Sequence, residues 1–218
     1  MRKSYRIPLA IAGLLAISAM TGLVVLIHPS VSSKEIDSAF DRTKFDQLKR
    51  RPLKLPVLAT NERCPVSHGS KTMVPPVEYI FCSGCFWYSK GPVFSAMAWS
   101  DETDDEARFA LSKKMPREGH FYLVKTPWVT PPDYSGPILI RGGRLNESAA
   151  GKLRFSVYGQ ASDALELEAP TRERSDPSHW SFWPTYIFVP GPGCYGVQLD
   201  TTNATEVVVF EALTPSQR

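Results

Sequence analysis

From Cys64 onward the chain consists of short runs of β-branched and aromatic residues, separated by proline, glycine, asparagine and aspartate. Such runs are typical of β-strands, because branched and aromatic side chains pack well on a pleated sheet. Residues 152–158 alternate polar and apolar side chains, as a strand that buries one face does. No helical period is present after Arg51. We therefore expect a mainly β domain, an immunoglobulin-like β-sandwich, with a small β-barrel as the alternative.

The same pattern predicts where several strands lie. Residues 195–199 alternate in polarity, residues 200–204 are turn formers, and residues 207–210 form a continuous apolar run suited to a central strand. Together they predict a hairpin that closes the domain. Residues 137–141 and 185–189 are expected to be further strands.

An uncharged run from Ile7 to Ile27 directly follows a basic N-terminal tail. A helix needs about 20 apolar residues to cross a hydrocarbon core, whereas the apolar part of a signal peptide has about 7 to 15. Residues 1–6 are therefore predicted to be a cytoplasmic tail and residues 7–28 a transmembrane or signal-anchor helix. Cleavage near residues 31–33 remains open, because their side chains are small.

The charge distribution bears on topology and on partners. Six basic residues between positions 34 and 51 favour the reverse orientation by count, but the short tail and its adjoining basic residues favour an exported domain. We expect a single-pass protein of the cytoplasmic membrane with its domain outside, or a secreted protein if the segment is cleaved. The tail carries the whole net charge of +3, so the remainder is balanced and no nucleic-acid partner is expected.

A helix is predicted immediately after the membrane segment. Residues 32–35 match a capping box, which indicates a helix over residues 34–50 with Leu48 among its apolar positions. Its other faces are charged, so it is either a stalk beside the membrane or a helix lying on the domain. Residues 29–63 are thus expected to be a linker with an amphipathic helix, and residues 64–218 the extracytoplasmic domain.

The four cysteines all follow the membrane segment. An even number of cysteines in an exported domain favours disulfides, and four cysteines allow three pairings. We favour Cys64 with Cys194, which would close a loop of about 130 residues and stabilise the fold by roughly 4 to 5 kcal/mol in the chain-entropy model. Cys82 and Cys85 would then pair with each other or stay reduced.

Two chemical roles compete with purely structural disulfides. Cys82 and Cys85 have the C-x-x-C spacing of thiol redox sites, although no helix is predicted to follow them. Cys64, His68, Cys82 and Cys85 together offer four zinc-type ligands, but oxidation competes for the thiols outside the cytoplasm. We therefore expect no metal, no cofactor and no catalytic residue. His68 is then a solvated loop histidine.

Aromatic residues are the remaining candidates for binding. Exposed rings stack on sugars or anchor a protein partner, whereas rings in a sandwich more often fill the core. Trp180, Trp183 and Tyr186 are the candidate ligand-binding residues, and the core is the favoured place for Trp87 and Trp183.

Several short motifs rich in proline, glycine and aromatic residues occur in order along residues 64–210. They are Cys64-Pro65, residues 87–94, residues 125–128, GPILIRGGRL at 136–145, residues 183–186, and PGPGCY at 190–195. Through them the chain resembles a family of uncharacterised exported or membrane-anchored bacterial β-sandwich proteins. The resemblance implies a leader before one β-rich domain and no established reaction. The chain departs from the family in lacking a lipobox cysteine and in having Cys82 and Cys85.

These observations predict a membrane-tethered extracytoplasmic module that binds a protein or glycan, or serves a structural role in the envelope. Its expected partners are the membrane, through the N-terminal helix, and an envelope protein or glycan. An enzyme is the alternative, a thiol-redox or zinc enzyme that would use Cys64, His68, Cys82 and Cys85.

Overall fold

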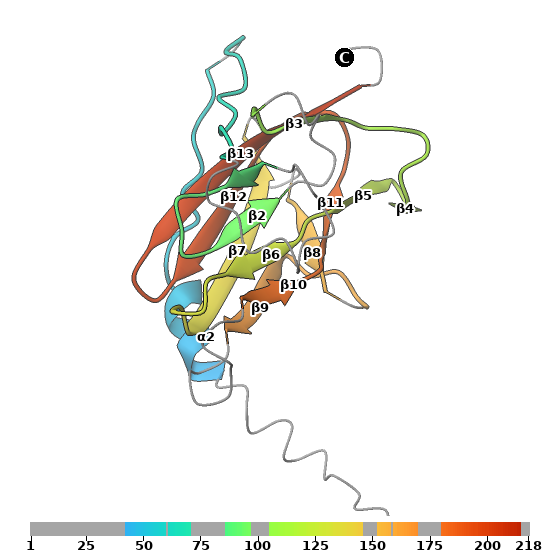
Figure 1. Ribbon diagram of the computed structural model, residues 1–218. Coiled ribbons are helices and arrows are strands. Elements are labelled where there is room, and N and C mark those ends of the chain that lie inside the picture. Colours follow the sequence, from blue (N-terminus) through green and yellow to red (C-terminus); the bar gives the residue numbers. More distant parts are fainter. Residues whose placement is uncertain are drawn as a thin grey trace, which may run out of the picture. The chain divides into compact units, whose positions relative to one another are not determined.

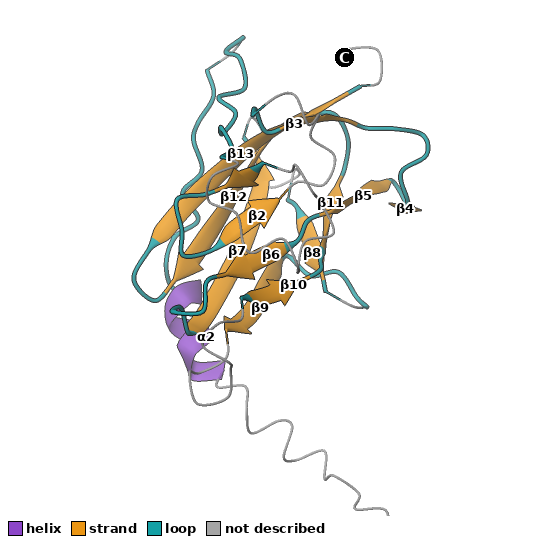
Figure 2. Cartoon of the chain, viewed as in Figure 1, coloured by secondary structure: helices purple, strands orange, loops and turns teal. Residues whose placement is uncertain are grey.

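The computed structural model describes residues 42–59, 61–70, 86–96, 105–145, 152–157, 159–169 and 180–214. The predicted membrane segment, residues 7–28, lies outside this part of the chain. No helix within the described ranges is long and apolar enough to cross a membrane. The described part is mainly β, as predicted, and Figure 2 shows its one short helix beside the strands.

The helix is α2 (Arg42–Lys49), and thirteen strands are described. The strands are β1 (Trp87–Tyr88), β2 (Phe94–Ala96), β3 (Arg108–Ala110), β4 (Arg117–Glu118), β5 (Phe121–Lys125), β6 (Trp128–Thr130), β7 (Gly136–Arg144), β8 (Arg154–Ser156), β9 (Ala164–Ala169), β10 (Ser181–Trp183), β11 (Tyr186–Val189), β12 (Gly193–Thr201) and β13 (Thr205–Leu213).

The strands form three sheets, with orders β1-β2-β6-β10, β4-β5-β11-β8 and β3-β13-β12-β7-β9. All strand pairs are antiparallel except β3 with β13, which run parallel. None of the three sheets closes on itself in the described part, so the barrel alternative has no support. The predicted closing hairpin is confirmed: β12 and β13 pair from Gly193 and Ala212 to Asp200 and Thr205 (Figure 1).

The two four-stranded sheets are joined through two strands that bend together. Residues 126 and 127 connect β5 to β6, and residues 184 and 185 connect β10 to β11, with a proline at each bend. Proline cannot donate to a strand ladder, so the pairing is interrupted there. The Thr126 amide donates to the Thr185 carbonyl at 2.9 Å, and the Thr185 hydroxyl donates to the Thr126 carbonyl at 2.6 Å. These bonds keep the two halves in one bent layer.

The main core lies between this bent layer and the five-stranded sheet. Alternate residues of each strand enter it, as expected from the twofold repeat of side chains along a strand. The predicted alternation is confirmed at Tyr195, Val197 and Leu199, which are all core residues. Opposite them the bent layer contributes, among others, Tyr88, Val124, Trp128, Phe155, Ile187 and Val189.

Helix α2 packs on the outer face of the five-stranded sheet, against β7. Phe45 and Leu48 are buried, and ion pairs at 3.2 and 2.7 Å join Lys44 to Glu168 and Lys49 to Glu166 of β9. The helix therefore lies on the domain, the second of the two predicted positions. The described helix begins at Arg42, and residues 34–41 of the prediction lie outside the described part.

The segment after α2 continues along the same outer face. We call residues 51–59 and 61–70 the strap; it runs beside β12 and β13 (Figure 1). Its apolar side chains join a second cluster on this face, made of Leu55, Leu58, Cys64, Val66, Leu145, Cys194, Val207 and Val209. Within the described part, Phe45 and Leu48 already pack onto the sheet, inside the stretch that was expected to be a linker.

Candidate functional site

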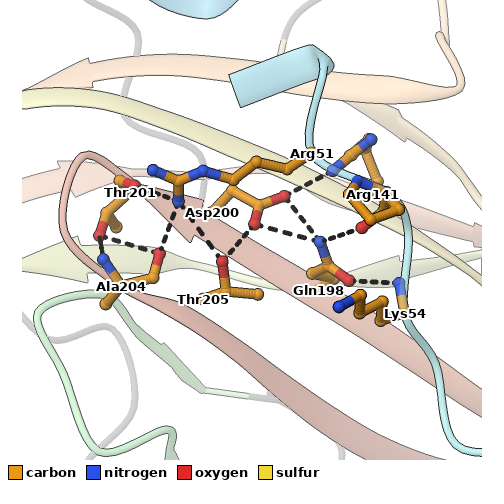
Figure 3. Close-up of polar contacts among 9 residues, drawn as sticks. Arg51, Lys54, Arg141, Gln198, Asp200, Thr201, Ala204 and Thr205 are labelled. Carbon is orange, nitrogen blue, oxygen red and sulfur yellow. Dashed lines mark hydrogen bonds and ion pairs between the residues drawn. The ribbon is translucent and has the colours of Figure 1, made fainter. Parts of the chain in front are cut away.

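The strap is attached to the sheet by polar contacts around the hairpin turn of β12 and β13 (Figure 3). The Arg51 guanidinium donates to the carbonyl oxygens of Thr201, Thr202 and Ala204 at 2.7, 2.8 and 3.2 Å. A guanidinium carries several donors in a fixed plane, so it can bind more than one carbonyl oxygen of a turn at once. Arg51 therefore caps the turn and holds the beginning of the strap in place.

A buried carboxylate and amide on β12 complete this attachment. The Gln198 side chain accepts from the Lys54 amide at 2.7 Å and donates to the Pro52 carbonyl at 3.1 Å. It thereby satisfies main-chain groups of the strap that a neighbouring strand would otherwise bond. Asp200 has no exposed surface and accepts from Gln198, from Arg141 at 2.6 Å and from Thr205 at 2.7 Å. A buried carboxylate is tolerated only with such partners. This cluster is an anchor for the strap.

The predicted disulfide is present at the other end of the strap. Cys64 and Cys194 are bonded, with Cα atoms 5.5 Å apart and 130 residues between them in the sequence. A disulfide sulfur has no thiolate to bind zinc, so the four-ligand set that includes Cys64 is incomplete while this bond exists. Cys82 and Cys85 lie outside the described residues. No group of three metal-ligand side chains occurs in the described part.

The three aromatic binding candidates do not share one surface. Trp183 packs against the main core, as expected for it, whereas Trp180 packs against a third cluster on the outer side of β1, β2 and β6. That cluster contains Trp87, whose side chain is 2% exposed. Tyr186 is 37% exposed and is the candidate that faces solvent most.

Tyr186 belongs to a mixed aromatic and cationic surface on the outer face of the sheet β4-β5-β11-β8. It lies directly across from Lys125 in β5. The Phe121 ring lies edge-on to Phe188, with centroids 6.3 Å apart, and the Arg154 guanidinium carbon is 5.8 Å from the Phe121 ring centre. We call Phe121, Lys125, Arg154 and Tyr186 the aromatic surface. Rings and guanidinium groups of this kind contact sugars and protein side chains.

A cavity of about 470 Å³ is present on another part of the molecule, beside β13. It is lined by Ser67, His68, Ser89, Lys90, Glu206 and Val207. The Glu206 carboxylate holds one wall of the cavity in place, because it accepts hydrogen bonds from the Ser89 hydroxyl and from the Lys90 amide, the latter at 2.9 Å. Ser89 has φ of 96°, a left-handed conformation that non-glycine residues adopt only when their surroundings hold them.

His68 lies at the mouth of this cavity. Its Nδ1 atom is 3.2 Å from Asp105 Oδ2, and its side chain is 63% exposed. The side chain is solvated, as expected, although residue 68 forms an isolated antiparallel bridge with Glu106. The Ser89 hydroxyl is hydrogen-bonded to the Glu206 carboxylate, and no hydrogen bond joins it to His68 among the described residues.

Beside this cavity, at Val207, one edge of β13 is not paired with another described strand. The Thr201 amide donates to the Ala204 carbonyl, which sets the alternation of hydrogen bonds along β12 and β13. Because the ladder bonds of an antiparallel pair involve every second residue, the main-chain groups of Val207 point away from β12. Val209, two residues on, confirms this alternation, because its amide donates to the Ser67 hydroxyl and its carbonyl accepts from the Ser67 amide.

Sequence reasoning missed both the anchor and the cavity. Gln198 and Asp200 alternate with apolar neighbours, a pattern that normally marks a solvent-exposed face. Ser89 and Glu206 are 117 residues apart and carry no local signal of their contact. No family model, curated protein or solved structure matches the chain. The family resemblance therefore stays a prediction from the sequence.

Proposed function

We propose that the chain is a membrane-tethered extracytoplasmic module that binds a protein or glycan through the aromatic surface. The exposed Tyr186, flanked by Lys125 and on the same sheet face as the Phe121 and Arg154 pair, is the observation that carries the binding role. A ring beside cations offers a stacking plane and hydrogen-bond donors together. Strand β11 is paired on both sides, which positions these side chains before binding and lowers the entropic cost.

The disulfide between the strap and β12 supports a location outside the cytoplasm. Disulfides persist in oxidising compartments and are rare in the cytosol, and the Cys64–Cys194 bond lies within a packed apolar cluster. Protease treatment of intact cells that produce the full chain tests this proposal. Degradation of the domain in intact cells is expected, whereas protection until the cells are lysed would support the reverse orientation.

We further propose that the fold is an immunoglobulin-like β-sandwich. The order β13-β12-β7-β9 corresponds to the G-F-C-C′ order of a variable-type sheet, with β12 and β13 as the F and G strands. Tyr195, near the start of β12, donates its hydroxyl to the Gly191 carbonyl at 2.7 Å, as the tyrosine corner of such domains does. The Cys64–Cys194 bond differs, because it lies on the outer face of the sheet and not between the sheets.

Binding can be tested with the full chain in detergent or nanodiscs, against an array of bacterial envelope glycans and an envelope protein extract. The variant Tyr186→Ala is expected to lower binding of any captured ligand by about tenfold, which corresponds to the loss of one well-packed ring contact. Val57→Ala is the matched control, since Val57 is an exposed apolar residue of the strap. Equal binding by both variants and the parent would contradict a role for the aromatic surface.

The thiol or zinc enzyme remains the alternative proposal. Its zinc form requires Cys64 as a thiolate, whereas the structure has Cys64 bonded to Cys194. Its redox form requires a reversible couple of Cys82 and Cys85, which lie outside the described residues. Titration of free thiols in the purified chain, with metal analysis, separates the two proposals. Four thiols with one bound zinc would favour the zinc enzyme, and a Cys82–Cys85 couple that is reduced and reoxidised reversibly at high potential would favour the redox enzyme. The absence of both agrees with the binding module.

A further inference from the structure

We propose that the open edge of β13, at Thr205 and Val207, binds an extended peptide by strand addition. This site is separate from the aromatic surface, so the inference goes beyond the proposed function. It rests on three features of the described residues: the direction of the main-chain groups, the cover along the rest of the edge, and the cavity beside Val207.

The direction of the main-chain groups follows from the register. Thr201 pairs with Ala204 at the turn, so the residues of β13 that bond to β12 are those at positions 206, 208, 210 and 212. The amide and carbonyl groups of Thr205, Val207 and Val209 therefore point to the opposite side. A strand edge of this kind presents donors and acceptors at the spacing of another strand.

The rest of this edge is covered within the domain. Glu211 donates its amide to the Ala107 carbonyl at 2.9 Å, and β3 pairs in parallel with residues 211–213. Val209 is bonded to Ser67 on both its amide and its carbonyl. Toward the turn, no described hydrogen bond reaches the outward main-chain groups of Val207 or Thr205. The hydrogen-bonded part of the edge therefore ends at Val209, and the open part lies beside the cavity at Val207.

The cavity supplies the space that an added strand needs. Its volume of about 470 Å³ lies within the range of ligand sites, and Val207 is one of its lining residues. The turn that bounds it is held by Glu206 through Ser89 and Lys90, and Gly91 donates its amide to the Ser89 hydroxyl at 3.1 Å. The wall is thus fixed by hydrogen bonds before any ligand arrives.

The open main-chain amides and carbonyls of β13 indicate that the ligand is an extended polypeptide. Alternating main-chain donors and acceptors on one edge match the alternating acceptors and donors of a peptide, and strand addition is an established mode of peptide recognition. A glycan has hydroxyl groups but no repeat of amides at strand spacing. The side chain of a bound peptide that faces the cavity would meet the polar groups of Ser67, His68 and Lys90.

The decisive variant is Val207→Pro. Proline removes the outward amide of residue 207 but no bond to β12, and it is tolerated on edge strands where the missing amide would face solvent. Val207→Thr is the matched control, because it keeps the amide and the β-branched shape. Circular dichroism and thermal unfolding of both variants establish that they are folded before binding is measured.

The probe is a random hexapeptide phage library, selected against the full chain in detergent with Val207→Pro as the counter-selection. We expect peptides that bind the parent and Val207→Thr equally and bind Val207→Pro at least about tenfold more weakly, since hydrogen bonds at the edge are lost. N-methylation at alternate peptide residues should weaken binding to the same extent, whereas methylation of the intervening residues should not. Failure to enrich any peptide over the counter-selection would overturn the proposal.

Amide hydrogen exchange provides a second readout with its own internal control. The Val207 amide should exchange rapidly in the free protein and slowly with a selected peptide bound, while the Val208 amide, which bonds to β12, should be slow in both states. Unchanged exchange at Val207 would show that the peptide binds elsewhere. A concentration-dependent dimer that is lost in Val207→Pro would show that a second copy of the chain occupies the edge, which would also overturn the proposal.

Discussion

The two faces of the five-stranded sheet are buried by different means. On the inner face, side chains such as Val197 and Phe210 meet the bent layer in a core of apolar residues. On the outer face, α2 and the strap are held by a disulfide, by Arg51 on the hairpin turn, and by the buried Asp200. The inner face depends on apolar area, which has no preferred direction, whereas the outer face combines a smaller apolar cluster with bonds of fixed geometry.

This difference has a physical reason in the length of the elements involved. The bent layer is a sheet and buries many alternate side chains at once. The strap is a single extended segment, and a segment without strand neighbours of its own buries too little apolar surface to offset its loss of conformational entropy. The hydrogen bonds of Arg51 and Gln198 and the Cys64–Cys194 disulfide add the stabilisation that the apolar contacts of the strap lack. The comparison predicts large effects from apolar truncation on the inner face and graded effects on the outer face.

The largest expected effect is on the inner face. Phe210 is 1% exposed and its ring stacks with those of Tyr195 and Phe109, at centroid distances of 5.2 and 5.6 Å. Phe210→Ala should lower the free energy of unfolding by about 4 kcal/mol, because it removes a buried ring and leaves a cavity. Urea denaturation measures this loss. Val207→Ala, at a partly buried position on the outer face, should cost much less; equal losses would contradict the comparison.

The second effect concerns the disulfide. Replacing Cys64 and Cys194 together by alanine should lower the free energy of unfolding by about 3 kcal/mol, since the unfolded chain regains the entropy of a long loop. Denaturant unfolding of the variant and the parent measures the difference. Limited proteolysis should cut the variant first within the strap, at residues 61–70. Cleavage that begins in the β12–β13 hairpin instead would argue that the strap does not depend on the bond.

The third effect tests the buried anchor. Arg141→Met should cost about 2 kcal/mol, less than the loss of about 3 to 5 kcal/mol usual for a broken buried pair, because Gln198 and Thr205 still donate to Asp200. Asp200→Asn is the partner variant. The double variant should be more stable than the two single losses predict when added, since the two groups interact directly at 2.6 Å. Simple additivity in thermal or urea unfolding would rule out this coupling.

The fourth effect depends on pH. Burial raises the pKa of the Tyr134 phenol, which donates a hydrogen bond to the Pro137 carbonyl at 2.8 Å. The folded chain therefore keeps this proton at a pH where the unfolded chain begins to lose it, so the contribution is fully present below about pH 10 and is lost as pH rises further. Tyr134→Phe should cost about 1 kcal/mol at pH 7 and should reduce the fall in stability above pH 10. An identical alkaline fall in both proteins would contradict this assignment.

The smallest effect is expected at the surface of α2. The Lys49 and Glu166 side chains of its ion pair are 47% and 28% exposed. Lys49→Ala should change the free energy of unfolding by less than about 0.5 kcal/mol, because such pairs are screened by solvent and salt. Leu48→Ala, on the buried side of the same helix, is the contrasting control and should cost several times more. A large effect of Lys49→Ala would mean that charge, not apolar packing, holds the helix on the sheet.

Local patterns identified the parts of the fold that depend on neighbours in sequence. The alternation at residues 195–199 placed Tyr195, Val197 and Leu199 in the core, and the turn residues that follow marked the hairpin. The Cys64–Cys194 pairing was favoured from the number and placement of the cysteines, and the structure has it. These inferences succeed because side-chain periodicity and turn chemistry act over a few residues.

Local sequence patterns were enough to predict the strand class and the closing hairpin, and to favour one cysteine pair. The folded arrangement was needed to show that α2 and the strap belong to the outer face, that Asp200 is buried, and that Trp183 and Tyr186 lie on different faces. It also decided where the edge of β13 is left open beside a cavity. Each of these depends on contacts between segments far apart in the chain, and polarity along one strand cannot show what will cover it.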